Sequence, residues 1–148
     1  MIRKANKFDK PQIIEMLKMF RDESPIEQYK NLENAEYINR LLDSIIAGQG
    51  VIFIADGIGM IMGLIIPTIW DDKSLALYEL AWYVKPEHRS TSALVGYRLF
   101  REYIAYAKEL KDSGRIKLYT MAKMVTSPDI KYEKYGFTQI EESWMNNV

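Results

Sequence analysis

The 148-residue sequence contains no cysteine and only one histidine, His88. The lack of cysteine excludes disulfide bonds, thiolate zinc sites and a cysteine nucleophile. A single histidine cannot form a multi-histidine metal site within one chain, so we expect no bound metal. A chain without disulfides also suits a reducing compartment, and we expect a cytoplasmic protein.

An excess of charge of either sign is also missing. Twenty Lys and Arg residues balance twenty Asp and Glu residues. Proteins that bind nucleic acid mainly through electrostatics carry a clear excess of basic residues. We therefore expect no nucleic-acid partner.

Apolar runs long enough for targeting or membrane insertion are scarce. Polar residues follow the N-terminus at once, so we expect no signal peptide. The stretch from Val51 to Trp70 has the length of a membrane span, but Asp56-Gly57-Ile58-Gly59 interrupts it. That interruption divides the stretch into two strand-length runs, as in a β-hairpin. We expect no membrane association.

The sequence does contain enough apolar residues, 48% of the total, to form a core. The length fits a single domain, which we assign to residues 1–148. Hydrophobic periodicity, capping residues and breakers predict the order β-α-α-β-β-β-α-β-α-β. Strands are expected over residues 2–5, Val51–Ala55, Met60–Ile69, Leu75–Val84, Ile116–Met121 and Phe137–Trp144. Helices are expected from Asp9 to about Ser24, from about Asn34 to Ala47, from the loop 87–92 to Gly114, and from Ser127 to Tyr135.

This order predicts an α/β fold with a mixed sheet and helices on both faces. The unit from residue 75 to residue 121 is expected to be a right-handed crossover that joins parallel strands. The strands before it should form an antiparallel meander.

The segment from Pro86 to Ala93 is a candidate anion site. It joins a strand to the N-terminus of a long helix, where free backbone N–H groups and the positive helix end point the same way. Arg89 would add a charge-assisted hydrogen bond to a phosphate. The alternative is an ordinary loop in which Ser90, Thr91 or Ser92 caps the helix.

Several segments together resemble the GNAT family, acyltransferases that take an acyl group from acetyl-CoA. They are the element order, Ile2-Arg3-Lys4-Ala5, Glu79–Ala93 and Tyr132-Glu133-Lys134-Tyr135-Gly136-Phe137. The resemblance covers nearly the whole chain. It implies a sheet that splays beside Val84, acetyl-CoA as co-substrate, and direct transfer of acetyl to a primary amine. The acceptor would be a small molecule or a peptide. Many relatives are dimers, so a homodimer is a further expectation.

The same resemblance implies where coenzyme A would bind. In the family, a strand ending in Val-x-Pro leads into Arg/Gln-x-x-Gly-x-Gly/Ala, and Val84-Lys85-Pro86 and Arg89 match this pattern. Ser92 and Leu94 stand at the two Gly positions, unless the loop is two residues longer and Gly96 takes the second. The pantetheine arm would follow the strand edge, and the implied contacts are Trp82, Tyr83, Val84, Arg89, Ser90, Thr91, Ser92, Ala93 and Leu94. A bulky Leu94 near the phosphates suggests an alternative function, a catalytically degenerate binding module with weak or no coenzyme A binding.

Three residues are candidates for the chemistry. By resemblance, Tyr132 protonates the departing thiolate, and the backbone N–H of Val84 stabilises the oxyanion. Glu79 is the candidate base that takes the proton of the amine through a water. Strand alternation predicts Glu79 on the face of Ala81 and Tyr83. The alternatives are that Tyr132 anchors the last helix and that Glu79 is a partly exposed strand residue.

The acceptor is expected near the connection between the first two helices. There Ser24 and Tyr29 are the candidate substrate-binding residues. The aromatic rings of Trp70, Trp82 and Tyr83 are further candidates for the lining of this site, although each is also explained as core or surface.

Overall fold

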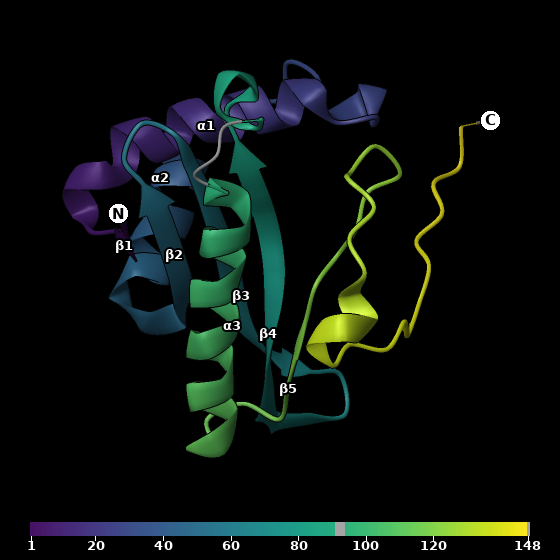
Figure 1. Cartoon of the computed structure of the whole chain (residues 1–148). Coiled ribbons are helices and arrows are strands. Elements are labelled where there is room, and N and C mark those ends of the chain that lie inside the picture. Colours follow the sequence, from purple (N-terminus) through teal and green to yellow (C-terminus); the bar gives the residue numbers. More distant parts are fainter. Residues whose placement is uncertain (91–93, 148) are drawn as a thin grey trace.

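The computed structural model describes residues 1–90 and 94–147 and contains one mixed sheet (Figure 1). The sheet has five strands in the order β1-β2-β3-β4-β5. Neighbouring strands are antiparallel up to β4, and β4 and β5 are parallel. The bounds are β1 (Ile2–Lys4), β2 (Gly50–Ala55), β3 (Gly59–Thr68), β4 (Asp71–Val84) and β5 (Leu118–Thr120). The predicted meander and the parallel crossover are both confirmed.

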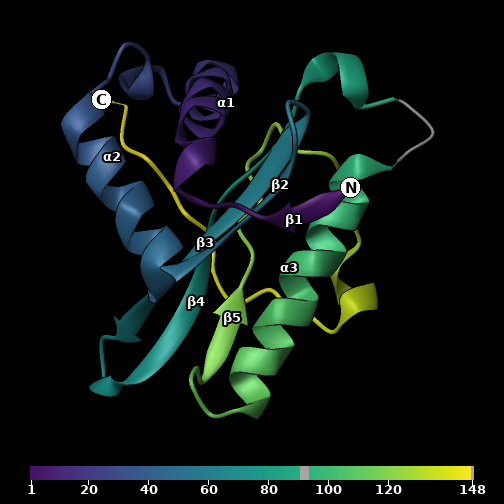
Figure 2. The ribbon, with the colours of Figure 1, turned by 90° about the vertical axis from the view of Figure 1, so that its left-hand side faces the viewer.

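Helices cover both faces of the sheet. Figure 2 shows α1 (Lys10–Glu23) and α2 (Ala35–Ser44) on one side and α3 (Val95–Asp112) on the other. A π-helical turn, η3 (Ile45–Gln49), continues α2 toward β2. Short 3-10 turns lie in the connections, namely η1 (Lys7–Asp9), η2 (Glu27–Tyr29), η4 (Pro86–His88) and η5 (Tyr132–Tyr135).

The two faces of the sheet bury two separate apolar clusters. On one face α3 buries the stripe Leu99, Phe100, Tyr103, Ile104, Ala107 and Leu110 against side chains of β2, β3 and β4. Its i, i+3, i+4 spacing is the reason this segment is a helix with one apolar side. On the other face Ile13, Met16, Leu42 and Ile45 pack on Ile52, Ile54, Met60 and Met62.

A β-bulge in β4 changes which side chains share a face. The register shifts between Met62, which pairs with Ala81, and Gly63, which pairs with Glu79. Leu80 is therefore the extra residue, and the alternation of side chains reverses across it. Leu77 and Trp82 both pack in the cluster under α3, whereas Ala81 lies in the opposite cluster.

The sheet splays between β4 and β5. The two strands pair only where Ala76–Tyr78 meets Leu118–Thr120, while β4 continues to Val84. Figure 1 shows the chain leaving β4 after β5. The expected splay beside Val84 is thus present, and it leaves the edge of β4 from Glu79 to Val84 without a pairing strand in the described part of the chain.

The prediction of a last strand over Phe137–Trp144 is wrong, because these residues have no regular secondary structure. Ile140 is 71% exposed and Trp144 is 86% exposed, so the alternating pattern finds no apolar surface to bury. The predicted helix from Ser127 is also shorter and is limited to η5. Before it the chain makes tight turns, in which Ser127 donates to the Met124 carbonyl and Ile130 donates to the Pro128 carbonyl.

Candidate functional site

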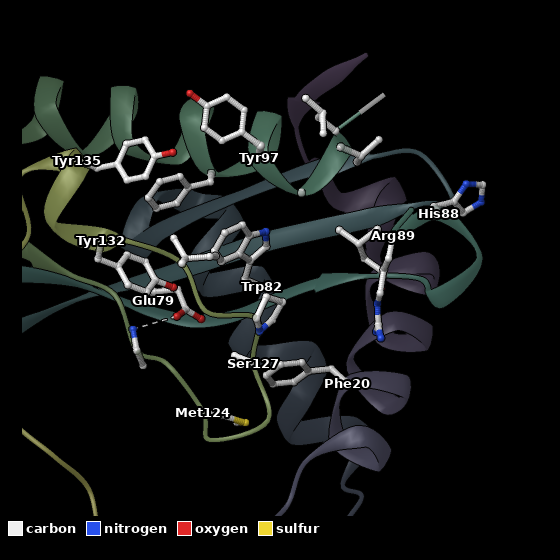
Figure 3. Close-up of a pocket in the computed structure, with 18 of the residues that line it drawn as sticks. Phe20, Glu79, Trp82, His88, Arg89, Tyr97, Met124, Ser127, Tyr132 and Tyr135 are labelled. Carbon is white, nitrogen blue, oxygen red and sulfur yellow. Dashed lines mark hydrogen bonds between the residues drawn. The ribbon is translucent and has the colours of Figure 1, made fainter. Parts of the chain in front are cut away.

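A cavity of about 400 Å³ opens where the sheet splays (Figure 3). Its walls are the unpaired edge of β4, the first turns of α3, the segment after β5, and η5. Phe20 of α1 closes one end. Most of the lining is apolar or aromatic, as is usual for small-molecule sites.

The edge of β4 presents backbone hydrogen-bonding groups to this opening. Lys85 donates to the Ile58 carbonyl at 2.8 Å, so Lys85 directs its N–H toward β3. In an antiparallel pair adjacent residues alternate, and Val84, which pairs with Gly59, directs its backbone groups to the open edge. The Val84 carbonyl accordingly accepts from Arg89 Nε at 2.7 Å. Trp82, two residues earlier, has the same orientation as Val84, and both line the cavity.

The N-terminus of α3 forms a second wall. Leu94 is the residue before the first turn, with left-handed φ 50° and ψ 42°, and its hydrocarbon side chain caps none of the helix N–H groups. Val95, Gly96 and Tyr97 follow and line the cavity. A Cβ added at Gly96 would lie 3.5 Å from Val84 Cγ2, so helix and strand approach closely here. A helix N-terminus of this kind attracts anions.

The start of α3 places the two residues that compete for the second Gly position of the loop. Because α3 begins at Val95, Leu94 directly precedes the helix and Gly96 lies in its first turn. The Leu94 side chain is 65% exposed, so it lines the rim and leaves the cavity open. Ser90 is exposed and does not line the cavity. The predictions for Thr91, Ser92 and Ala93 fall outside the described residues.

Arg89 is engaged on the α1 side of the site. Its guanidinium donates to both carboxylate oxygens of Glu23, at 2.8 and 2.9 Å, and lies 5.3 Å from the ring centroid of Tyr83. Figure 3 shows the side chain pointing away from Tyr97 of α3 and toward α1. In this conformation Arg89 lines the cavity but does not reach toward the start of α3, where the phosphate was expected.

Glu79 lies at the bulge and faces the cavity. Its Oε1 accepts a hydrogen bond from the backbone N–H of Ala122 at 3.2 Å, which links β4 to the diverging chain after β5. Burial disfavours the charged carboxylate and raises the pKa of Glu79 to about 7, although the Ala122 hydrogen bond opposes the shift. The alternation prediction for Glu79 is wrong, because the bulge puts Glu79 on the face of Trp82 and not on that of Ala81 and Tyr83. The strand pattern alone carries no sign of a bulge.

Tyr132 faces the cavity from η5, with its hydroxyl in the region of Glu79 (Figure 3). Its ring makes edge contacts with Phe100 and Phe137, with centroids 6.1 and 5.9 Å away. Burial and the negative charge of Glu79 raise the pKa of Tyr132 to about 12. The residue therefore packs η5 against α3 and also presents a protonated hydroxyl to the cavity.

The other predicted residues lie outside the cavity. Tyr83 is buried on the α1 face, where its ring meets Phe20 edge-on at 6.2 Å. The Ser24 hydroxyl accepts from the backbone N–H of Ile26 at 3.2 Å, in the turn after α1. Tyr29 and Trp70 are exposed, and Trp70 lies at the turn between β3 and β4. None of these four side chains lines the site.

Sequence reasoning missed much of the lining. Tyr97 and Phe100 belong to α3, and Phe100 is visible in the sequence only as a member of the helical stripe. Met124, Pro128 and Ile130 come from a segment without periodicity, so only the three-dimensional arrangement reveals them. Phe20 enters from the far end of α1.

Two negative observations concern the described residues alone. Within residues 1–90 and 94–147, no group of three or more His, Cys, Asp or Glu is placed to hold a metal ion. Over the same ranges, no helix has the length and apolar character that crossing a membrane requires.

Comparison with known proteins gives the fold. No family model matches the sequence. The Der GTPase-activating protein YihI of Haemophilus influenzae is 38% identical over 47 residues, which are 32% of this chain and 25% of that protein. The match therefore spans only about a quarter of the length of that curated relative.

Solved structures resemble the whole chain. A predicted acetyltransferase from Clostridium acetobutylicum, solved with acetyl-CoA, has a TM-score of 0.72 at 21% identity and covers 99% of this chain and 95% of its own. A putative acetyl transferase from Pyrococcus furiosus has a TM-score of 0.63 at 20% identity, with 100% and 99% covered. An aminoglycoside acetyltransferase from an uncultured soil sample has a TM-score of 0.62 at 16% identity, with 100% and 97% covered. The chain thus has the fold of the GNAT acetyltransferases.

Proposed function

We propose that this protein is an N-acetyltransferase that moves the acetyl group of acetyl-CoA directly to a primary amine. The observation that carries the proposal is the cavity between the unpaired edge of β4 and the N-terminus of α3, with Glu79 and Tyr132 facing into it. The likeness to an acetyltransferase solved with acetyl-CoA supports the choice of co-substrate.

Coenzyme A would use the two walls that offer backbone groups. The pantetheine arm would pair with the open edge of β4 at Trp82 and Val84, as an added strand does. The pyrophosphate would lie at the first turn of α3, against the N–H groups of Val95, Gly96 and Tyr97. Gly96 keeps this approach free of side-chain atoms.

The chemistry then follows from the groups that face the cavity. The nitrogen lone pair of the neutral amine attacks the thioester carbonyl carbon, and the Val84 N–H stabilises the oxyanion. Glu79 accepts the proton that the amine nitrogen loses, directly or through a water. When the carbon–sulfur bond breaks, the hydroxyl of Tyr132 donates a proton to the thiolate of coenzyme A. The amide and free coenzyme A leave, and solvent returns the two proton carriers to their starting states.

The pKa values suit these roles. Because the pKa of Glu79 is raised to about 7 by burial, the carboxylate is a stronger base than an ordinary glutamate while still being substantially ionised near neutral pH. The pKa of Tyr132, raised to about 12, keeps its hydroxyl protonated and ready to donate.

A second candidate is a binding module that keeps the fold without turnover. The engagement of Arg89 by Glu23 favours it, because this guanidinium is then not offered to a phosphate. The exposed Leu94 side chain and the open cavity favour the enzyme, since the module was suggested by a bulky Leu94 side chain that would crowd the phosphates. The enzyme is the better-supported function.

The test is release of the coenzyme A thiol from acetyl-CoA in the presence of a panel of primary amines, with the product identified by mass spectrometry. We expect amine-dependent thiol release and an acetylated amine, and a Tyr132→Phe variant should lose about 10- to 1000-fold in kcat. Incubation with acetyl-CoA alone should leave the mass of the protein unchanged. A stable acetyl-protein adduct that an amine then discharges would contradict direct transfer. If none of the amines in the panel causes thiol release, the proposed function is contradicted.

A further inference from the structure

The cavity has two chemically different ends. Tyr97 and Tyr135 lie at the α3 end, and Phe20, Met124 and Ser127 lie at the other end, beyond Glu79 and Trp82 (Figure 3). If coenzyme A enters along the start of α3, its acetyl group comes to rest near Glu79. The acceptor then has to occupy the opposite end of the cavity, beside Phe20. We call this end the acceptor end.

The acceptor end is largely apolar. Phe20 of α1 and Met124 of the segment after β5 lie at this end (Figure 3), and Leu80, Pro128 and Ile130 add further apolar lining to the cavity. The polar side chains on this side are Ser127 and Arg89, and the Arg89 guanidinium is already paired with Glu23. Such a lining favours an aliphatic or aromatic body over a strongly hydrated one.

Negative charge among the described residues that line the cavity is limited to one group. Among the described residues that line the cavity, Glu79 is the only carboxyl group. Two acidic side chains nearby, Glu23 and Asp129, already have cationic partners. Glu23 pairs with Arg89 at 2.8 Å, and Asp129 pairs with Lys123 at 2.8 Å and with Lys131 at 3.4 Å.

A substrate with several ammonium groups does not fit this charge pattern. Each ammonium that enters an apolar site without a carboxylate partner loses hydration that nothing replaces. The one carboxyl is also the group assigned to take the proton of the reacting amine. No described lining residue is left to pair with a second ammonium.

We propose that the acceptor is a small primary monoamine carried on an apolar aliphatic or aromatic body, and that polyamines and aminoglycosides are poor acceptors. This inference rests on the proposed function. It assigns Phe20, Leu80 and Met124 to specificity and Glu79 to the reacting nitrogen. The acceptor class differs from that of the aminoglycoside acetyltransferase whose fold the chain shares.

The test compares two acceptors that differ by one ammonium group, hexylamine and 1,6-diaminohexane, with spermidine and kanamycin as larger polycations. At saturating acetyl-CoA we expect kcat/KM for thiol release to be at least ~10-fold higher for hexylamine than for 1,6-diaminohexane. A preference for the diamine, spermidine or kanamycin would overturn the inference while leaving the proposed acetyltransferase function intact.

A charge variant of Leu80, which follows Glu79 at the bulge and lines the cavity, makes the test specific. Leu80 is 40% exposed at the bulge, so Leu80→Asp adds a second carboxylate where a polar side chain is tolerated. We expect this variant to lower the hexylamine to diamine ratio by about 10-fold, whereas the neutral Leu80→Asn lowers turnover of both amines without changing their ratio. An unchanged ratio in Leu80→Asp would contradict the inference that the single carboxylate of the lining selects monoamines.

Calorimetry with acetyl-CoA separates the two possible failures. Saturable binding of acetyl-CoA without acetylation of hexylamine or phenylethylamine would refute the monoamine inference alone. Absence of acetyl-CoA binding would refute the proposed function and the inference together.

Discussion

At the residue scale, the account depends most on Glu79. Its side chain lies between two strands that diverge, and its carboxylate accepts a hydrogen bond from the Ala122 N–H. Burial without a cationic partner is the reason its pKa rises to about 7. The same burial that makes this carboxyl a useful base also makes its ionisation costly to the folded state.

The first prediction concerns catalysis. Replacing Glu79 by Gln keeps an oxygen acceptor for the Ala122 N–H but removes the base, so kcat/KM should fall by about 100- to 10,000-fold. In the wild type, kcat/KM should rise with pH through about 7, and this rise should vanish in the variant. Glu133→Gln is the matched control, because Glu133 is exposed on η5 and does not line the cavity. An unaltered pH profile in Glu79→Gln would refute the role of Glu79 as base.

The second prediction concerns stability. The folded pKa of Glu79, about 7, is above its ordinary value of 4.5. Its contribution to stability is therefore fully present below pH 4.5 and is lost as the pH rises through 7. Glu79→Gln lacks this loss, so its free energy of unfolding should exceed that of the wild type by about 1–3 kcal/mol at pH 8 and by much less at pH 5. Urea unfolding at both pH values measures the difference, and an equal difference at the two values would be inconsistent with a raised pKa.

At the element scale, local patterns predicted most of the fold. The hairpin was expected from the Asp56-Gly57-Ile58-Gly59 interruption, and β2 and β3 follow it within one residue at each end. The long apolar stripe predicted α3 because its residues recur at the spacing of the helical period. These signals are local, and no partner element is needed to produce them.

Two element-scale features depend on distant partners and were therefore missed. A strand needs a neighbour, and the alternation from Phe137 to Trp144 has none in the described structure. The bulge at Leu80 is set by the pairing of β4 with β3. Without it, alternation predicted Glu79 on the wrong face. The candidate base was thus named from the sequence, as the acidic residue of the central strand, while its orientation required the structure.

The third prediction tests the packing beside the bulge. Gly63 pairs with Glu79 in the register, and a Cβ at Gly63 would overlap the hydroxyl of the buried Tyr103 and lie 3.0 Å from Leu77 Cδ1. Gly63→Ala should therefore lower the free energy of unfolding by about 1–3 kcal/mol. Gly96→Ala is the control, because its nearest atom would be at an ordinary contact distance of 3.5 Å.

A double variant identifies the clash. The Tyr103 hydroxyl has no hydrogen-bond partner in the described structure, so Tyr103→Phe should cost little by itself. Combined with Gly63→Ala, it should recover part of the lost stability. Additive losses in the double variant would mean that Tyr103 is not the group that excludes a side chain at Gly63.

At the scale of the whole molecule, the two clusters have different roles. The cluster under α1 and α2 lies between these helices and the antiparallel strands. The cluster under α3 instead continues into the cavity through Trp82, Phe100 and Tyr132. The walls proposed for coenzyme A could be predicted from sequence because a strand, a loop and a helix start are consecutive in the chain. The acceptor end was not, since Phe20 and Met124 are about a hundred residues apart in sequence and meet only in the folded protein.

The central claim is that acetyl-CoA binds between the edge of β4 and the start of α3. Its most direct test is calorimetric titration of acetyl-CoA into the wild type, Gly96→Glu and Arg98→Glu. Both variants put an acidic side chain in the first turn of α3, where it favours the helix. Gly96 lines the cavity, whereas Arg98 is exposed and does not. The account predicts saturable binding by the wild type and by Arg98→Glu, and a loss of at least ~10-fold in affinity for Gly96→Glu. Equal affinity in all three proteins, or no binding by the wild type at millimolar acetyl-CoA, would contradict it.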